Sequence, residues 1–200
     1  MKYEITHLLF NTEGVVNLDT KKYIKVQPGI MSPIIINIKA TLKNIKVRQK
    51  LAEELVKRVN PKSIGICGIE SGGNYYAAAV ADILRKPLIF FRKESKKYGI
   101  GNRFVGSLPE EKGGIVTIID DVLAGGMISM ANNKFLSEQG YASELVVIYS
   151  YLPKMVGSMA TVKVTTLADT NSLCGTGLKI GRFSKNDVRI IKRECIWSNI

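Results

Sequence analysis

Histidine is nearly absent from this sequence, which has one such residue, His7, among 200. Cysteine is also scarce: Cys67, Cys174 and Cys195 lie far apart and form no C-x-x-C pair. A zinc site made of cysteine and histidine is therefore excluded, because the ligands do not occur at metal-binding spacings. A hydrolase with a Ser-His-Asp triad is disfavoured by the same lack of histidine. Scattered cysteines are typical of a reducing compartment, so we expect a cytoplasmic protein.

Long hydrophobic runs and low-complexity segments are missing as well. Apolar stretches such as residues 34–36 and 145–148 are far too short to span a bilayer, so no membrane association is expected. The first residues include Glu4 and His7 before any apolar stretch, so no secretory signal is expected either. Without repeats or a Pro/Gly/Ser-rich linker, residues 1–200 are predicted to form a single domain.

Acidic residues are outnumbered, since 29 Lys and Arg against 17 Asp and Glu give a net charge of +12. A first basic cluster contains no acid and consists of Lys39, Lys43, Lys46, Arg48 and Lys50. A second cluster, residues 85–103, has seven basic residues against Glu94 alone. Such surfaces attract nucleic acid, anionic membranes or phosphorylated small molecules. For the first cluster, a solvated face is an equally good interpretation.

Short apolar segments alternate with helical patterns along most of the chain. Strands are predicted at residues 63–67, 88–91, 115–119, 145–149 and 161–165, and helices at residues 42–59, 75–84 and 125–138. A last helix begins at Ser184, which forms a cap with Asp187, and runs to about residue 196. The alternation predicts an α/β fold, with a doubly wound, mostly parallel sheet and helices on both faces. A short helix and a small strand pair precede this sheet within residues 2–38.

Residues 115–129, IVTIIDDVLAGGMIS, are the strongest indication of a ligand site. A hydrophobic strand ends in Asp120 and Asp121, and a loop with Ala124, Gly125 and Gly126 then opens a helix. Backbone N–H groups of such a loop, with the positive end of the helix dipole, bind a phosphate monoester. The two carboxylates suit the hydroxyls of a neighbouring ribose or a hydrated Mg²⁺. A helix capped by one Asp accounts for only part of this pattern.

Two further segments follow strands of the predicted sheet, whose carboxyl ends are where open α/β sheets bind ligands. Residues 68–79 form a glycine-rich turn that either presents N–H groups to a second phosphate or only permits a tight turn. Residues 91–106 combine five cations with three glycines, which a lid closing over a polyanion requires. A solvated surface loop has a similar composition.

Three motifs together resemble one enzyme family. Residues 115–129 resemble the ribosyl 5-phosphate loop of type I phosphoribosyltransferases, in which two acids precede small residues that open a helix. The RKESKKYG segment at residues 92–99 resembles the mobile catalytic loop of orotate phosphoribosyltransferases. GIMSP at residues 29–33 is similar to that family's Ser-Gly-x-x-Ser-Pro turn. The order and spacing of the motifs agree with the family from about Tyr23 to Val164.

This resemblance implies the type I phosphoribosyltransferase fold, with residues 1–40 as an N-terminal hood-like segment and residues 41–200 as the α/β core. It implies a Mg²⁺-dependent transfer of ribose 5-phosphate from phosphoribosyl pyrophosphate to a pyrimidine base, with release of pyrophosphate. Orotate is the expected base. The magnesium ion is carried by the pyrophosphate donor, without a direct protein ligand. The family's active form is a homodimer in which the mobile loop reaches the neighbouring site.

The resemblance also assigns roles to individual residues. Lys93 and Lys96 are the implied catalytic residues of the mobile loop, which contacts the donor together with Arg92 and Tyr98. The implied pyrophosphate loop consists of Glu70, Ser71, Gly72 and Gly73. The implied ribose and 5-phosphate site consists of Asp120 and Asp121, followed by Val122, Leu123, Ala124, Gly125, Gly126, Met127 and Ile128. The implied base contacts are Ile35, Ile36 and Ala124.

The chain departs from the family's pattern mainly around the base. A loop Thr is replaced by Ala124, a later Thr or Ser by Met127, and the loop His by Tyr98. After the fourth strand the family has an Asp-Arg pair, whereas Ser150 and Tyr151 stand here. Residues on the phosphate side are thus kept better than those on the base side, which predicts weak use of orotate. The alternative is a regulator of the same fold that senses phosphoribosyl pyrophosphate and binds nucleic acid.

Overall fold

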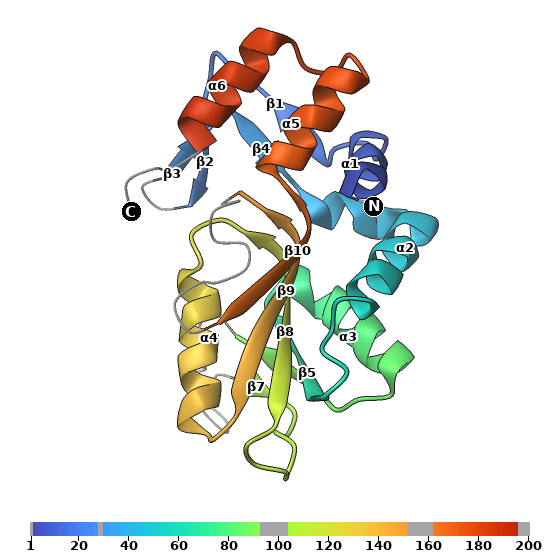
Figure 1. Ribbon diagram of the computed structural model, residues 1–200, viewed down its shortest axis with the longest axis vertical. Coiled ribbons are helices and arrows are strands. Elements are labelled where there is room, and N and C mark those ends of the chain that lie inside the picture. The colour runs from blue at the N-terminus through green and yellow to red at the C-terminus, as the bar shows by residue number, and fades with distance from the viewer. Residues whose placement is uncertain (1, 28–29, 93–103, 152–161, 196–200) are drawn as a thin grey trace.

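The computed structural model describes residues 2–27, 30–92, 104–151 and 162–195 of the chain. At its centre is a six-stranded sheet in the order β10-β9-β8-β5-β6-β7 (Figure 1). The strands are β5 (Ser63–Ile69), β6 (Leu88–Phe91), β7 (Phe104–Val105), β8 (Ile115–Leu123), β9 (Ala142–Ser150) and β10 (Lys163–Asp169). Neighbouring strands pair in parallel, except for the antiparallel pair of β6 and β7. The predicted α/β fold with a mostly parallel sheet is confirmed.

Helices cover both faces of this sheet, because successive side chains of a strand point to opposite faces. On one face, α3 (Gly72–Leu84) packs over β5 and β8, with α2 (Ile45–Val56) beside it. On the other face, α4 (Met127–Glu138) packs over β9. Neighbouring residues of β8 show the alternation, since Ile119 belongs to the first hydrophobic core and Ile118 to the second.

A smaller layer lies over the carboxyl ends of the central strands (Figure 1). It consists of α1 (Lys2–Phe10), β1 (Val16–Leu18), β2 (Ile24–Gln27), β3 (Ile30–Ser32), β4 (Ile34–Ile36) and the 3₁₀ helix η1 (Ile38–Lys43), joined by α5 (Thr170–Lys179) and α6 (Lys185–Cys195). β1 pairs with β4 and β2 with β3, both antiparallel. The predicted hood of residues 1–40 is thus completed by C-terminal helices, because α5 packs against α1 and α6 against β3.

The predicted end of the third central strand at residue 119 is wrong. β8 continues to Leu123, because its ladder with β9 runs on through the pairs Asp120–Val147, Val122–Tyr149 and Leu123–Ser150. The two acids therefore belong to the strand. The loop before α4 is shortened to residues 124–126, which brings the start of α4 close to the carboxylates.

The last two helices differ in how well the sequence predicts them. The predicted cap of α6 is confirmed, since Ser184 Oγ accepts a hydrogen bond from Asp187 N at 3.1 Å and Asp187 Oδ2 accepts one from Ser184 N at 2.8 Å. α5 is not predicted from its sequence, TNSLCGTGLK, because two glycines and two threonines give it a low helix propensity. It forms because Asp169 and Ser172 cap it reciprocally and because one of its faces is buried.

Candidate functional site

A cavity of about 110 Å³ lies where β5 and β8 end and α3 and α4 begin. We call it the acidic cavity. Its lining consists of Lys39, Ile69, Glu70, Ser71, Gly72, Asp120, Asp121, Val122, Leu123, Ala124, Gly126, Ile128 and Ser129. These residues come from three segments far apart in the sequence, which the parallel sheet brings together at its carboxyl edge.

Asp120 and Asp121 are held at the acidic cavity by neighbouring backbone N–H groups. Asp120 Oδ1 accepts a hydrogen bond from Asp121 N at 2.8 Å, and Asp121 Oδ1 accepts one from Val122 N at 3.0 Å. Gly72 lies so close to Asp121 that a Cβ on this glycine would overlap the carboxylate. Position 72 therefore requires glycine if α3 is to begin directly beside this carboxylate.

Two helices begin at the acidic cavity. α3 begins at Gly72, and α4 begins after Gly126, whose φ of 76° lies in the left-handed region that favours glycine. The first N–H groups of a helix lack intrahelical partners and carry the positive end of its dipole, so both starts attract an anion. Lys39 is the single cation of the described lining and stands among three acidic residues. The cavity thus combines anion sites at the helix starts with carboxylate acceptors for hydroxyl groups.

A second cavity, of about 350 Å³, lies between the end of β8 and the N-terminal layer. We call it the apolar cavity. Its lining consists of Asn17, Lys25, Val26, Ile35, Ile36, Asn37, Ile38, Lys39, Asp121, Val122, Ala124 and Tyr151. Seven of these twelve residues are aliphatic or aromatic, and the charged ones are Lys25 and Lys39 against Asp121. Apolar walls with a few polar groups are typical of sites that bind a flat ring.

The two cavities share part of their lining. Four residues belong to both linings: Lys39 of η1, Asp121 and Val122 at the end of β8, and Ala124 just after it. A ligand in the acidic cavity therefore lies next to a ligand in the apolar cavity. This arrangement allows a group to pass directly from one ligand to the other.

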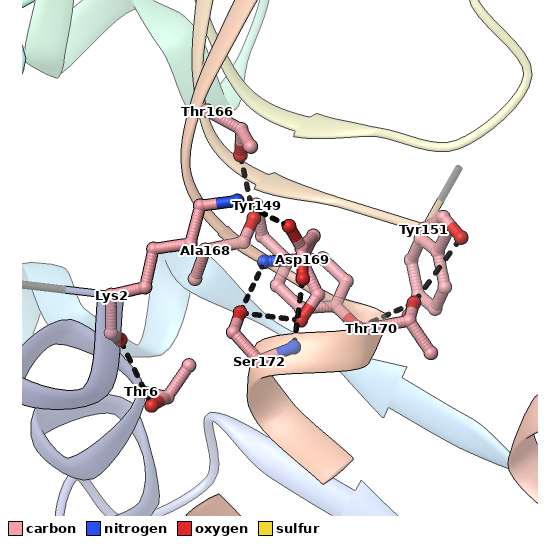
Figure 2. A network of polar contacts seen from close by, with 9 residues as sticks. All are labelled: Lys2, Thr6, Tyr149, Tyr151, Thr166, Ala168, Asp169, Thr170 and Ser172. Carbon is pink, nitrogen blue, oxygen red and sulfur yellow. Dashed lines mark hydrogen bonds and ion pairs between the residues drawn. The ribbon is translucent and has the colours of Figure 1, made fainter. Parts of the chain in front are cut away.

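Tyr151, the first residue after β9, joins the apolar cavity to the N-terminal layer. Its hydroxyl accepts a hydrogen bond from Ile36 N at 2.8 Å and donates one to the Ile34 carbonyl oxygen at 3.2 Å. Its own carbonyl oxygen accepts one from Thr170 Oγ1 at 3.2 Å, within the polar network at the start of α5 (Figure 2). Burial raises the pKa of Tyr151 well above its usual value, so the phenol stays neutral.

The structure brings together most of the residues that the sequence assigns to the phosphate side. Those that line the acidic cavity are Glu70, Ser71, Gly72, Asp120, Asp121, Val122, Leu123, Ala124, Gly126 and Ile128. Gly73, Gly125 and Met127 are outside its lining, and Arg92, just after β6, lines neither cavity. Lys93, Lys96 and Tyr98 lie outside the described residues. Ile35, Ile36 and Ala124, assigned to the base, line the apolar cavity.

Several lining residues are not predicted from the sequence. Lys39 belongs to the first basic cluster, whose acid-free composition indicates a cationic surface but no particular site. Lys25 and Ser129 carry no sequence pattern of their own, because only the fold places them at the cavities. The resemblance does point to Tyr151, which stands where the family has its Asp-Arg pair, but it gives this residue no role.

Comparison with known proteins links this site to one family. The model of the phosphoribosyl transferase domain matches residues 36–128, which include Glu70, Asp120 and Asp121 of the acidic cavity. An orotate phosphoribosyltransferase of Fusobacterium nucleatum is 30% identical over 153 residues, covering 74% of this chain and 72% of that protein.

Two solved structures have a similar fold. The orotate phosphoribosyltransferase of Aeropyrum pernix has a TM-score of 0.68 at 23% identity, covering 90% of this chain and 99% of that one. Leishmania donovani UMP synthase has a TM-score of 0.77 at 19% identity over 96% of this chain, and the chain spans 41% of that protein's length.

Proposed function

Since the chain belongs to the orotate phosphoribosyltransferase family, we propose that it transfers the ribose 5-phosphate group of phosphoribosyl pyrophosphate to orotate. A bond forms between the anomeric carbon of the ribose and a ring nitrogen of the base, and this nitrogen gives up its proton to the released pyrophosphate or to water. The bond from that carbon to the pyrophosphate oxygen breaks, and pyrophosphate leaves with the bonding electrons. The observation that carries the proposal is the shared wall of the two cavities, because the transfer requires donor and acceptor in contact. The product is a pyrimidine nucleotide.

In this proposal the donor occupies the acidic cavity. Asp120 and Asp121 accept hydrogen bonds from the ribose hydroxyls, and the start of α4 binds the 5-phosphate. The pyrophosphate lies at the start of α3, next to Ser71 and Gly72. Positive charge develops on the ribose carbon as negative charge grows on the leaving pyrophosphate. In the proposal, Asp121 stabilises the positive charge on the ribose carbon and Lys39 stabilises the negative charge on the pyrophosphate.

Magnesium is the proposed cofactor. Among the described residues, no group of three or more His, Cys, Asp and Glu side chains is placed to hold a metal ion. The acidic cavity does contain Glu70, Asp120 and Asp121, whose negative charge favours a hydrated cation that the phosphate oxygens of the donor hold. These residues fit an ion that arrives with the donor. When bound, the ion neutralises charge on the leaving pyrophosphate.

The base occupies the apolar cavity. Val26, Ile35 and Ile36 provide apolar contacts for a flat ring. Lys25 and Lys39 favour an anionic base, because a carboxylate that leaves water requires an opposite charge or a hydrogen-bond donor. Orotate has both features, because it is a flat ring that carries a carboxylate. The family's Arg is replaced by Tyr151, so we propose that orotate binds less tightly than the donor.

The mobile loop, the assembly and the compartment belong to the proposal as well. The resemblance gives Lys93 and Lys96 a role in neutralising the leaving pyrophosphate, and Tyr98 a role in donor binding. Because this loop reaches the neighbouring site in the family, we propose a homodimer.

No helix among the described residues is long and apolar enough to cross a bilayer. The described cysteines are free thiols, which supports a reducing compartment such as the cytoplasm.

The direct test is the release of pyrophosphate from phosphoribosyl pyrophosphate with Mg²⁺, in the presence and absence of orotate. We expect release that depends on orotate, with a KM for orotate well above that for the donor. Asp120→Asn combined with Asp121→Asn should lower kcat/KM for the donor at least about a hundredfold, because charged acceptors are lost. Asp82→Asn, at an exposed position of α3, is the matched control and should leave kcat/KM for the donor unchanged.

Two results would contradict the proposal. One is the absence of release with every base tested, and the other is release at the same rate with and without base. The alternative regulator of the same fold would show the first result together with salt-sensitive binding of RNA or DNA. The relatives named above are enzymes by name and give that alternative no support.

A further inference from the structure

The backbone of β4 has two edges with different partners. On one edge β4 pairs with β1, with Asn17 opposite Ile35. Backbone hydrogen bonds continue along this edge on both sides of β4. Asp19 N donates to the Pro33 carbonyl and Asn37 N donates to the Val15 carbonyl, both at 2.8 Å. Because alternate residues of a strand bond to opposite sides, the backbone groups of Ile34 and Ile36 face away from β1.

Two hydroxyls occupy that second edge. Ser32 Oγ accepts a hydrogen bond from Ile34 N at 3.1 Å and donates one to the Ile34 carbonyl oxygen at 2.7 Å. Tyr151 Oη accepts the hydrogen bond of Ile36 N–H at 2.8 Å and donates to the Ile34 carbonyl at 3.2 Å. The Tyr151 hydroxyl offers one hydrogen-bond donor and one acceptor. A pyrimidine ring offers the same pair through an adjacent N–H and C=O. The cavity proposed for the base is lined by Ile36 and Tyr151 themselves. The Tyr151 hydroxyl therefore stands where the amide edge of a base would pair with the strand.

Tyr151 is firmly fixed in this position. Its backbone N donates to the Leu123 carbonyl at 2.9 Å, and its carbonyl accepts from Thr170 Oγ1 at 3.2 Å. Its ring packs edge-on against Tyr149 with the centroids 5.1 Å apart, and only 2% of the residue is exposed. Figure 2 shows Tyr151 beside Thr170 at the start of α5. A ligand cannot displace the hydroxyl without breaking several of these contacts.

Building on the proposed function, we infer that Tyr151 is a specificity-determining residue for the acceptor base. Its hydroxyl occupies Ile36 N–H and so denies this edge of β4 to the N–H and C=O groups of a pyrimidine, which orotate and uracil share. Recognition is left to the charge of the acceptor, which Lys25 and Lys39 at the same cavity attract. A carboxylated pyrimidine is then accepted, and a neutral one such as uracil is rejected.

The test is Tyr151→Phe, which removes the hydroxyl and keeps the ring. Steady-state kinetics with orotate and uracil should show kcat/KM for uracil rising about tenfold, through a lower KM, because Ile36 N–H becomes free to pair with a carbonyl of the base. The Ile34 carbonyl keeps its hydrogen bond from Ser32 Oγ. For orotate, kcat/KM should change less than threefold, since its carboxylate is already held by the lysines. The KM for the phosphoribosyl donor should stay unchanged.

Tyr149→Phe is the matched control. Tyr149 is also fully buried, and its hydroxyl lies 3.0 Å from Thr170 Oγ1, but it does not line the apolar cavity. This variant loses a buried hydroxyl in the same cluster and should keep the orotate-to-uracil ratio of the wild type. If both variants shift the ratio equally, or if Tyr151→Phe leaves it unchanged, the inference is wrong.

A measurement on the wild type checks the inference without any variant. Benzoate has a ring and a carboxylate but no amide edge, whereas uracil has the edge but no charge. We expect benzoate to inhibit competitively against orotate at lower concentrations than uracil does. Stronger inhibition by uracil would overturn the inference while leaving the proposed function intact. If the wild type releases no pyrophosphate with orotate, it is the proposed function that fails.

Discussion

At the scale of single residues, the two glycines that begin α3 have different neighbours. A Cβ on Gly72 would overlap the carboxylate of Asp121, which belongs to a side chain and not to the backbone. A Cβ on Gly73 would lie 2.5 Å from the Ile119 carbonyl oxygen, which belongs to the backbone of β8. The first glycine thus sets the position of a site carboxylate, and the second allows the helix to pack on the sheet.

This contrast predicts different effects for Gly72→Ala and Gly73→Ala. Gly72→Ala should weaken donor binding about tenfold with little change in stability, because it displaces the carboxylate. Gly73→Ala should lower the free energy of unfolding by about 1–3 kcal/mol, because backbone must move. Urea unfolding and titration with the donor measure the two quantities. Unchanged donor binding in Gly72→Ala would show that Asp121 does not contact the donor.

At the scale of elements, α5 depends on the network at its first turn (Figure 2). Asp169 Oδ1 accepts from Ser172 N at 2.8 Å, and Lys2 Nζ of α1 lies 2.6 Å from Asp169 Oδ2. Burial on its own raises the pKa of Asp169, but the hydrogen bonds from Lys2 and Ser172 outweigh it and lower the pKa below its usual value. This contact holds α1, at the start of the chain, to the start of α5.

The lowered pKa predicts how this contact depends on pH. Such a carboxyl group stabilises the fold above its unfolded pKa of about 4, and the contribution is lost as pH falls through the lower folded value. Asp169→Asn keeps a hydrogen-bond acceptor for the cap but removes the charge. The free energy of unfolding of this variant should therefore lie below that of the wild type at pH 7, and the difference should shrink below about pH 4. Asp169→Ala should cost about 1 kcal/mol at pH 7. Urea unfolding from pH 7 to 3 tests this, and a constant deficit for Asp169→Asn would refute it.

At the scale of the whole molecule, the sequence predicts the sheet and the acidic cavity better than the apolar cavity. The strands contain short apolar runs that are buried on both faces, and Asp120 and Asp121 directly follow the apolar run of β8. The apolar cavity forms where distant segments meet, and the hydrogen bond from Ile36 to Tyr151 joins residues 115 positions apart. No local pattern reveals such a contact. α5 is missed for a related reason, since tertiary packing and its cap outweigh a poor helix propensity.

The central claim is that the acidic and apolar cavities hold donor and acceptor on either side of a shared wall. Lys39 lines both cavities, whereas Lys25 lines only the apolar one. Both side chains are exposed, so their replacement should not disturb folding. Lys22, exposed in the loop before β2 and outside both linings, provides the control.

The most direct test is therefore the KM of each substrate in Lys39→Met, Lys25→Met and Lys22→Met. Each lost charge contact should raise the affected KM about tenfold. The account predicts that Lys39→Met raises the KM for both phosphoribosyl pyrophosphate and orotate, that Lys25→Met raises only the KM for orotate, and that Lys22→Met raises neither. A Lys39→Met enzyme with a changed KM for only one substrate, or for none, would contradict the shared wall.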